Sequence, residues 1–177
     1  MTLPGGPTKD EILAISLAKL RLRPTDILAD IGCGTGTVAI RASPLVNRVL
    51  AIDLRGEAVA YAKKRAEEAC AGNIEFICGD AASVLPEAGR IDAAFVGGSR
   101  GLPAVLSLLA SRKVRSIVVN AVRLETVSTG VAAMQELGIF REAVQVQVCR
   151  TEPLGRGLIW KPLHPVTIIV GGEAGCS

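Results

Sequence analysis

Short apolar runs alternate with longer amphipathic segments along this chain of 177 residues. The runs have the length of strands, and they predict buried strands near 27–29, 48–52, 74–78, 91–96 and 116–120. The segments between them predict helices, because apolar residues recur there at helical spacing and proline or glycine marks several ends. This alternation predicts an α/β fold with a doubly wound, mostly parallel sheet.

The two ends of the chain differ from its middle. Thr8 opens a capping-box pattern, with a glutamate three positions later, and predicts a helix that starts there. Near the C-terminus, long strands at about 140–150 and 164–171 follow each other without a helix, which predicts an antiparallel C-terminal hairpin. Residues 152–158 are interpreted as its loop. We expect residues 1–177 to form one domain around a Rossmann-like, seven-stranded sheet.

A glycine-rich turn, Asp30-Ile31-Gly32-Cys33-Gly34-Thr35-Gly36, lies between the first predicted strand and a helix. Such a turn lets the backbone approach a ligand closely and directs free N–H groups toward it. Asp53 ends the next strand, 19 residues after Gly34, where a carboxylate can accept both hydrogen bonds of a ribose diol. Turn and acid together indicate a nucleoside cofactor, and we expect Asp53 to be exposed in the binding cleft.

The spacing of the glycines indicates which nucleoside cofactor the turn binds. A dinucleotide fingerprint would read G-x-G-x-x-G, but Thr37 stands at the third glycine position. The pattern here is D-x-G-x-G-x-G, which resembles motif I of the S-adenosylmethionine-dependent methyltransferases and implies their class I fold. Asp30 could recognise the ammonium group of S-adenosylmethionine. The alternative is a tight turn in an α/β protein that binds nothing.

Further candidate residues follow the third and fourth predicted strands, because ligands of such sheets bind beyond the carboxyl ends of the strands. Asp80 and Ala81 stand where methyltransferases contact adenine, although Asp80 could simply cap the next helix. Gly97-Gly98-Ser99 replaces the Asn/Asp-Pro-Pro-aromatic pattern of amino-group methyltransferases, which argues against methylation of adenine, cytosine or glutamine nitrogen.

Charge and composition limit the possible substrates and the cellular location of the protein. Residues 1–96 carry 11 Lys/Arg and 12 Asp/Glu, whereas residues 97–177 carry 9 and 5, so the basic excess lies in the part expected to face a substrate. This asymmetry favours an anionic substrate, with solvated surface charge as the alternative. Aromatic residues make up 3%, which leaves little for stacking on bases. The five cysteines form no C-x-x-C pair, so we expect reduced thiols, a cytoplasmic location and no metal site.

No apolar run approaches the length of a membrane span, and no signal peptide is visible in the sequence. The single histidine, His164, precedes a proline at the start of a predicted strand, which favours a structural role over a catalytic one.

A more selective resemblance covers nearly the whole chain. In order, the motifs are Gly6-Pro7-Thr8-Lys9, the glycine turn, Ala51-Ile52-Asp53, Gly79-Asp80-Ala81, Val96-Gly97-Gly98-Ser99 and Leu124-Glu125-Thr126. This order resembles the small decarboxylating methyltransferases of cobalamin synthesis. The resemblance implies methylation of C15 of a precorrin or cobalt-precorrin and decarboxylation of its C12 acetate. It also implies a homotetramer, the stand-alone form of the domain, and a separate C5-methyltransferase as a possible partner.

The resemblance and the strand-end rule together define a predicted site. The predicted S-adenosylmethionine site comprises Thr8, Asp30, Gly32, Cys33, Gly34, Thr35, Gly36, Asp53, Asp80, Ala81 and Gly97. The predicted substrate site, which includes cations for the carboxylates of a precorrin, comprises Gly98, Ser99, Arg100, Arg123 and Arg156, with Arg150 and Lys161 as further candidates. Glu125 is the candidate general base, and its alternative is a charge at a helix N-terminus.

Two other functions remain open at this point. An RNA or tRNA methyltransferase would use the same basic face to bind phosphates. The small number of aromatic residues argues against this function, and so does the lack of a recognisable added RNA-binding domain. A non-catalytic nucleotide-binding module would bind S-adenosylmethionine without turnover. Neither a nucleic acid nor a membrane is the expected partner.

Overall fold

The computed structural model describes residues 8–98 and 100–173. Seven strands form one sheet in the order β3-β2-β1-β4-β5-β9-β6. Their bounds are β1 (Ile27–Ile31), β2 (Arg48–Asp53), β3 (Ile74–Cys78), β4 (Ala93–Val96), β5 (Ser116–Ala121), β6 (Phe140–Val146) and β9 (Val166–Gly171). The pairs from β3 through β5 are parallel, and β9 is antiparallel to both β5 and β6. The predicted seven-stranded, mostly parallel sheet with an antiparallel pair at its end is confirmed.

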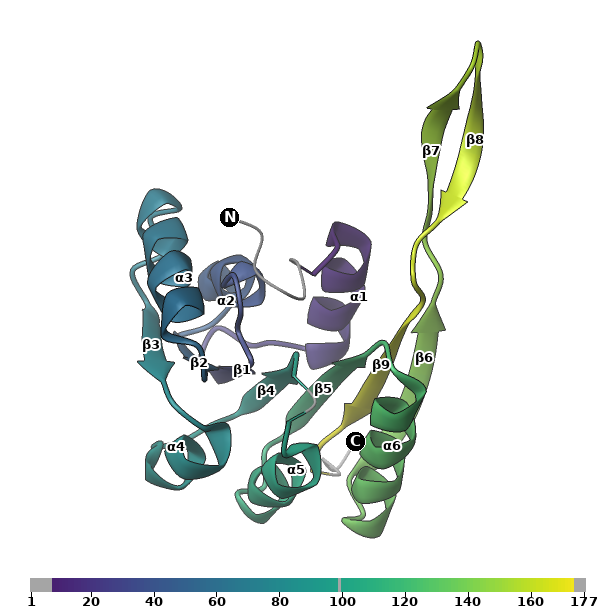
Figure 1. Ribbon diagram of the computed structural model, residues 1–177. Coiled ribbons are helices and arrows are strands. Elements are labelled where there is room, and N and C mark those ends of the chain that lie inside the picture. The colour runs from purple at the N-terminus through teal and green to yellow at the C-terminus, as the bar shows by residue number, and fades with distance from the viewer. Residues whose placement is uncertain (1–7, 99, 174–177) are drawn as a thin grey trace.

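Helices cover both faces of this sheet (Figure 1). On one face lie α1 (Asp10–Leu20), α2 (Thr37–Ala42), the short 3-10 helix η1 (Ser43–Leu45) and α3 (Gly56–Glu68). On the other lie α4 (Ala81–Glu87), α5 (Leu102–Ser111) and α6 (Leu124–Glu136). Two apolar clusters fill the layers between sheet and helices, as the predicted doubly wound arrangement requires.

Two boundaries differ from the predicted ones and affect the site. Helix α1 begins at Asp10 with Lys9 as its N-cap and has no side-chain capping bond, so the predicted start at Thr8 is wrong. Strand β1 continues through Asp30 to Ile31, because both residues pair with β2 on one side and with β4 on the other. The glycine turn therefore begins at Gly32, and Asp30 lies inside the sheet.

The interpretation of residues 152–158 as a loop is wrong. They belong to an antiparallel hairpin of β7 (Cys149–Leu154) and β8 (Gly157–Pro162), a separate two-stranded sheet that projects from the body between β6 and β9 (Figure 1). We call this hairpin the arm. Its turn has two residues, and Gly155 adopts the positive φ of 59° that such turns require. Every residue of β8 is exposed. The strand therefore needs no alternation of apolar and polar residues, which is the sequence pattern that predicts a half-buried strand.

The parallel strands bring their carboxyl ends to one edge of the sheet, next to the first turn of α1 and the base of the arm. Within the described residues, no helix is both long and apolar enough to cross a membrane.

Candidate functional site

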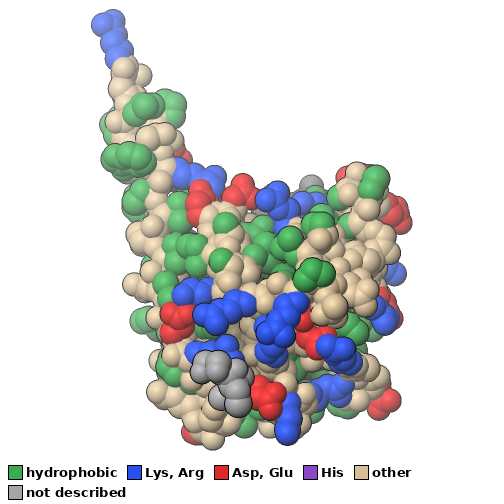
Figure 2. Space-filling view, turned by 180° about the vertical axis from the view of Figure 1, so that it is seen from behind, with side chains coloured by type: hydrophobic (Ala, Val, Ile, Leu, Met, Phe, Trp, Pro, Cys, Tyr) green, Lys and Arg blue, Asp and Glu red, His purple; other side chains and the backbone are tan. Residues whose placement is uncertain are grey.

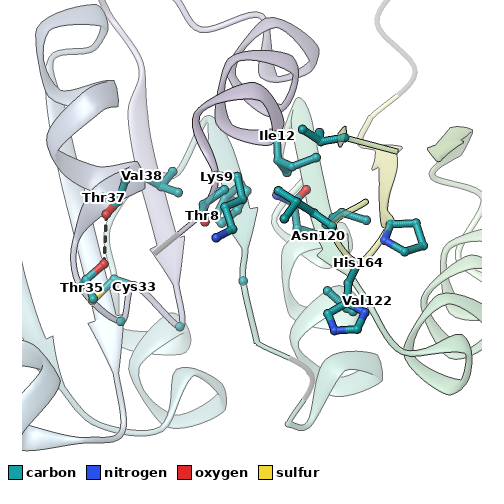
Figure 3. A pocket seen from close by; sticks show the side chains of 18 of the residues that line it. Thr8, Lys9, Ile12, Cys33, Thr35, Thr37, Val38, Asn120, Val122 and His164 are labelled. Carbon is teal, nitrogen blue, oxygen red and sulfur yellow. Dashed lines mark hydrogen bonds between the residues drawn. The ribbon is translucent and has the colours of Figure 1, made fainter. Parts of the chain in front are cut away.

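A pocket with a volume of about 1010 Å³ lies at this edge of the sheet. Figure 3 shows its two sides, with Cys33, Thr35, Thr37 and Val38 on one, Asn120, Val122 and His164 on the other, and Thr8, Lys9 and Ile12 of the α1 region between them. We call the first the loop side and the second the arm side, because the latter also contains Lys161 to Val166 from the base of the arm. The volume is at the upper end of the range for one small ligand, so a nucleoside leaves room for part of a second molecule.

The glycine turn on the loop side is held in place by backbone bonds and close packing. The N–H groups of Gly32 and Cys33 both donate to the carbonyl of Ile52, at 2.8 and 3.0 Å. Gly32 has φ of 73°, and a Cβ there would lie 3.0 Å from the nitrogen of Gly98. Only glycine therefore allows the turn to approach the corner after β4 so closely. Gly36 serves packing instead, since its added Cβ would lie 2.9 Å from the Cβ of Ala62 in α3.

Asp53 lies at the end of β2 and is bonded to the turn. Its Oδ2 accepts a hydrogen bond from Gly34 N at 2.8 Å, and its Oδ1 accepts from Arg55 N at 3.0 Å. The guanidinium of Arg55 also pairs with this carboxylate. Burial would raise the pKa of Asp53, but the bonds from Arg55 and Gly34 outweigh it and hold the pKa below its ordinary value.

The expectation that Asp53 is exposed in the cleft is wrong, because only 6% of its surface is accessible. Removing this carboxylate would leave the N–H groups of Gly34 and Arg55 without an acceptor. Asp53 therefore stabilises the glycine turn and the backbone that follows β2.

Asp30 presents a different arrangement at the end of β1. Its Oδ2 accepts a hydrogen bond from Ala39 N in α2 at 2.9 Å, whereas its buried Oδ1 has no partner and the residue lines the pocket. Burial raises the pKa of Asp30 to about 7, the bond from Ala39 opposes the rise, and the nearby charge of Asp53 adds to it. An unpartnered buried oxygen facing a pocket favours a ligand that brings a hydrogen-bond donor or a positive charge.

Cys33 and the threonines complete the loop side. Burial and the charges of Asp30 and Asp53 raise the pKa of the Cys33 thiol, so the thiol stays protonated and cannot act as a nucleophile. The hydroxyls of Thr35 and Thr37 lie 3.0 Å apart, as the dashed line in Figure 3 marks. Arg65 of α3 donates to the carbonyl of Thr35 at 2.7 Å and ties the turn to that helix.

The arm side combines polar and cationic groups. Nδ2 of Asn120, at the end of β5, donates to the Ser16 hydroxyl of α1 at 3.0 Å, and that hydroxyl donates to the Ile12 carbonyl at 2.7 Å. Lys161 of β8 lines the pocket and pairs with Glu152 of β7 at 2.8 Å. His164 also lines the pocket, which the sequence-based preference for a structural role did not anticipate.

The arm is joined to α1 by an ion pair in which one guanidinium nitrogen contacts both carboxylate oxygens. Nη2 of Arg150 in β7 lies 2.9 Å from both carboxylate oxygens of Glu11 in the first turn of α1. A backbone hydrogen bond to the Glu11 carboxylate and, after it, the bond from Arg150 hold the pKa of Glu11 below its ordinary value. Because Lys9 and Ile12 of the same region line the pocket, this pair holds two of its walls together.

The structure brings together part of the predicted site. Predicted cofactor residues that line the pocket are Thr8, Asp30, Gly32, Cys33, Gly34, Thr35 and Gly97. Predicted residues outside its lining are Gly36, Asp53, Asp80, Ala81, Gly98, Arg100, Arg123, Glu125, Arg150 and Arg156. Ser99 lies outside the described residues.

The residues outside the lining occupy distinct places. Asp80 is exposed at the N-cap of α4 and makes no side-chain capping bond, and Ala81 belongs to the apolar core. Arg156 lies in the turn at the tip of the arm. Glu125, in the first turn of α6, is 80% exposed and lies 3.8 Å from Arg123, a position typical of a charge at a helix N-terminus.

Sequence reasoning missed several lining residues for two reasons. Asn120 lies near the end of a buried strand, so the strand-end rule that selected Asp53 could have selected it as well. Gln147, Val148 and the segment 162–166 carry no such signal, because they reach the pocket only through the pairing of β6 with β9 and the path of the arm. Among the described residues, no group of three or more His, Cys, Asp or Glu side chains is placed to hold a metal ion.

A doubly wound sheet of this strand order, with a glycine turn and acidic strand ends at one edge, defines the class I methyltransferase fold. Comparison with known families is more specific, because residues 4–171 match the family described as "Precorrin methyltransferase domain". The chain belongs to this precorrin methyltransferase family.

Individual relatives agree with this assignment. A Methanosarcina acetivorans protein named "Probable cobalt-precorrin-6B C(15)-methyltransferase (decarboxylating)" is 43% identical over 176 residues, which cover 97% of this chain and 96% of the relative. The crystal structure of a precorrin 8W decarboxylase from Methanobacterium thermoautotrophicum is similar with a TM-score of 0.91, 29% identity, and coverage of 97% and 96%. That of a precorrin-6Y C5,15-methyltransferase from Geobacter metallireducens has a TM-score of 0.90, 28% identity, and coverage of 98% and 93%.

The raised pKa of Asp30 predicts how the free energy of unfolding changes with pH. The unfolded chain loses this proton near its ordinary pKa of 3.8, whereas the folded chain keeps it to about pH 7. Between these values the folded state binds more protons, so this group lowers the free energy of unfolding as pH rises, by up to about 1.4 kcal/mol per pH unit. Asp30→Asn should lack this pH dependence of the free energy of unfolding, although its amide oxygen can still accept the hydrogen bond from Ala39.

Denaturant unfolding of the wild type and of Asp30→Asn from pH 4.5 to 8 measures the difference directly. The exposed Asp10→Asn is the control and should follow the wild-type profile. Parallel profiles for the wild type and Asp30→Asn would mean that Asp30 is ionised throughout the range.

Proposed function

We propose that the loop side of the pocket binds S-adenosylmethionine. The donor set fits this group, because the unpartnered Oδ1 of Asp30 suits its ammonium and the carboxylate of Asp53 suits its ribose diol. The backbone of Gly32 to Thr35 would lie against the methionine portion, with Thr8 and Gly97 on either side. Asp80 and Ala81, which lie outside the lining, remain the candidates for the adenine edge.

We propose that the substrate is a precorrin-6B or cobalt-precorrin-6B, as the names of the relatives suggest. The reaction would methylate C15, release carbon dioxide from the C12 acetate and leave S-adenosylhomocysteine. The observation that carries this proposal is that one pocket joins the glycine turn to an arm side bearing Lys161, His164 and Asn120. Such a side can pair with the carboxylates of a tetrapyrrole held against the cofactor.

The chain's own residues would act mainly by positioning. When bound, S-adenosylmethionine supplies an electrophilic methyl group. The residues of the loop side would fix its direction, and Asn120, held by Ser16, would support the substrate at the end of β5. The raised pKa of the buried Cys33 thiol argues against covalent catalysis by that residue. Glu125 does not line the pocket and is largely exposed, so we assign it no proton transfer.

The two rival functions are less well supported. A likeness to an rRNA methylase at 16% identity reflects the fold alone. A non-catalytic module would not need a second side to its pocket. The family relationship and the arm side both favour an enzyme acting on a tetrapyrrole.

Turnover tests the proposal directly. Incubation of the protein with methyl-labelled S-adenosylmethionine and a precorrin-6B-type substrate should add one methyl group and remove one carbon dioxide, both visible by mass spectrometry. Cobalt-free and cobalt-bound substrates should be compared in parallel. Binding of S-adenosylmethionine without either mass change would favour the non-catalytic module, and methylation of RNA instead would favour the other rival.

The arm side makes a kinetic prediction. Lys161→Ala removes a cation from the pocket, so the KM for the tetrapyrrole should rise about two- to fivefold while the affinity for S-adenosylmethionine stays unchanged. Higher salt should raise the wild-type KM, because partly exposed ion pairs are screened.

Arg90→Ala, at the opposite end of the strands, is the matched control and should leave KM unchanged. Arg100→Ala and Arg156→Ala test the remaining arginines of the predicted site. Arg156 would affect KM only if the arm of one protomer reached the pocket of another. An unchanged KM for Lys161→Ala at every salt concentration would show that this charge does not contact the substrate.

We further propose that copies of the chain associate through the arm, as a homotetramer, with a separate C5-methyltransferase as a possible partner. Opposite residues of an antiparallel pair share a face, so Thr151, Pro153, Leu158 and Trp160 lie on one face of the arm and Arg150, Glu152 and Lys161 on the other. The uncharged face exposes 69% of Leu158 and 72% of Trp160 (Figure 2 shows hydrophobic side chains along the arm). An isolated two-stranded hairpin is marginal in water, so a partner surface would stabilise it.

Matched substitutions on the two faces test this association. Trp160→Lys places a charge on the uncharged face and should reduce the mass in sedimentation equilibrium. Ile159→Lys, one residue away and opposite Glu152, should leave the mass unchanged. A wild-type protein that sediments as a monomer, or equal masses for both variants and the wild type, would contradict association through this face.

A further inference from the structure

The carboxylate of Asp53 is fully occupied by the protein itself. Its Oδ1 accepts from Arg55 N and Arg55 Nε, both at 3.0 Å, and its Oδ2 accepts from Gly34 N at 2.8 Å and Arg55 Nη2 at 3.2 Å. A carboxylate offers about four acceptor positions. A further ligand can therefore donate hydrogen bonds to Asp53 only if at least one of these donors moves away.

Two of the four donors are fixed and two are movable. The N–H groups of Gly34 and Arg55 belong to the glycine turn and to the backbone just beyond β2, so they cannot leave without rearranging the fold. The Arg55 side chain is 39% exposed and lines the pocket, and its Nη2 lies 3.7 Å from the place of a Cβ on Gly34. The guanidinium therefore stands where a ligand on the loop side would reach Asp53.

We infer that Arg55 occupies Asp53 in place of a ribose diol, and that a bound nucleoside displaces its guanidinium. The inference rests on the proposed cofactor site. The ion pair keeps a buried carboxylate paired while no ligand is present, which avoids the cost of an uncompensated charge. The negative charge of Glu57, which already acts on Arg55, favours the displaced guanidinium as well.

This arrangement makes Arg55 a specificity-determining residue. A ribose with both hydroxyls returns two donors to Asp53 and so replaces the bonds from Nε and Nη2. A ligand without the diol can bind only beside the intact ion pair or at the cost of breaking it. The protein thus discriminates against nucleosides without a diol by a bond that they cannot replace.

Calorimetry with the whole protein tests the inference, using S-adenosylhomocysteine, adenosine and 2′,3′-dideoxyadenosine as ligands at pH 8. Arg55→Met removes the competing donors at similar length, so it should bind adenosine about two- to fivefold more tightly, the range of a partly exposed ion pair. Its affinity for dideoxyadenosine should equal that of the wild type. Arg55→Lys should bind adenosine with an affinity between those of the wild type and Arg55→Met.

Arg48→Met is the matched control, because it removes an ion pair with Glu75 away from the pocket, and it should change no affinity. A second measurement needs no variant. The side-chain Nε–H resonance of Arg55 in the wild type should shift when S-adenosylhomocysteine is added, and should not shift with dideoxyadenosine.

The outcomes separate this inference from the proposed function. Weaker or unchanged adenosine binding by Arg55→Met, an equal gain for dideoxyadenosine, or an Nε–H resonance unaffected by bound S-adenosylhomocysteine would each overturn the inference and leave the cofactor site intact. Failure of the wild type to bind either S-adenosylhomocysteine or adenosine would instead overturn the proposed cofactor site, and the inference with it.

Discussion

The hydrogen bond from Gly34 N to the carboxylate of Asp53 is the contact on which the pocket depends. It joins the glycine turn after β1 to the end of β2, two segments that the parallel pairing of these strands already brings side by side. The turn then sets the position of α2, whose Ala39 N–H is held by Asp30. Two carboxylates at neighbouring strand ends thereby hold the loop side in place, Asp53 through the turn and Asp30 through the helix behind it.

Asp30 and Asp53 are neighbouring carboxylates whose pKa values are displaced in opposite directions. Asp30 has one bond from a backbone N–H and an unpartnered oxygen, so burial dominates and its pKa rises to about 7. Asp53 accepts bonds from Gly34 and Arg55, and these lower its pKa despite burial. The site therefore holds one firmly ionised acid beside one whose charge can follow a ligand.

The sequence allowed the sheet and the loop side to be predicted because both depend on local signals. Strand-length apolar runs, the glycine spacing and an acid at a strand end are visible within about 30 residues, as in Asp30 to Asp53. The arm side was not predictable in the same way. Its residues Gln147, Lys161 and His164 come together through an exposed hairpin and through the pairing of β6 with β9, and neither leaves a pattern of buried positions.

The register of the arm has a consequence for the pocket. In a strand, neighbouring residues point to opposite faces, so a slip of one position between β7 and β8 would exchange the places of Trp160 and Lys161. The indole would then turn toward the body and the ammonium away from it. The Gly155-Arg156 turn prevents this by setting the pairing from the far tip. Two residues at the end of the arm thus determine the chemical character of a wall at its base.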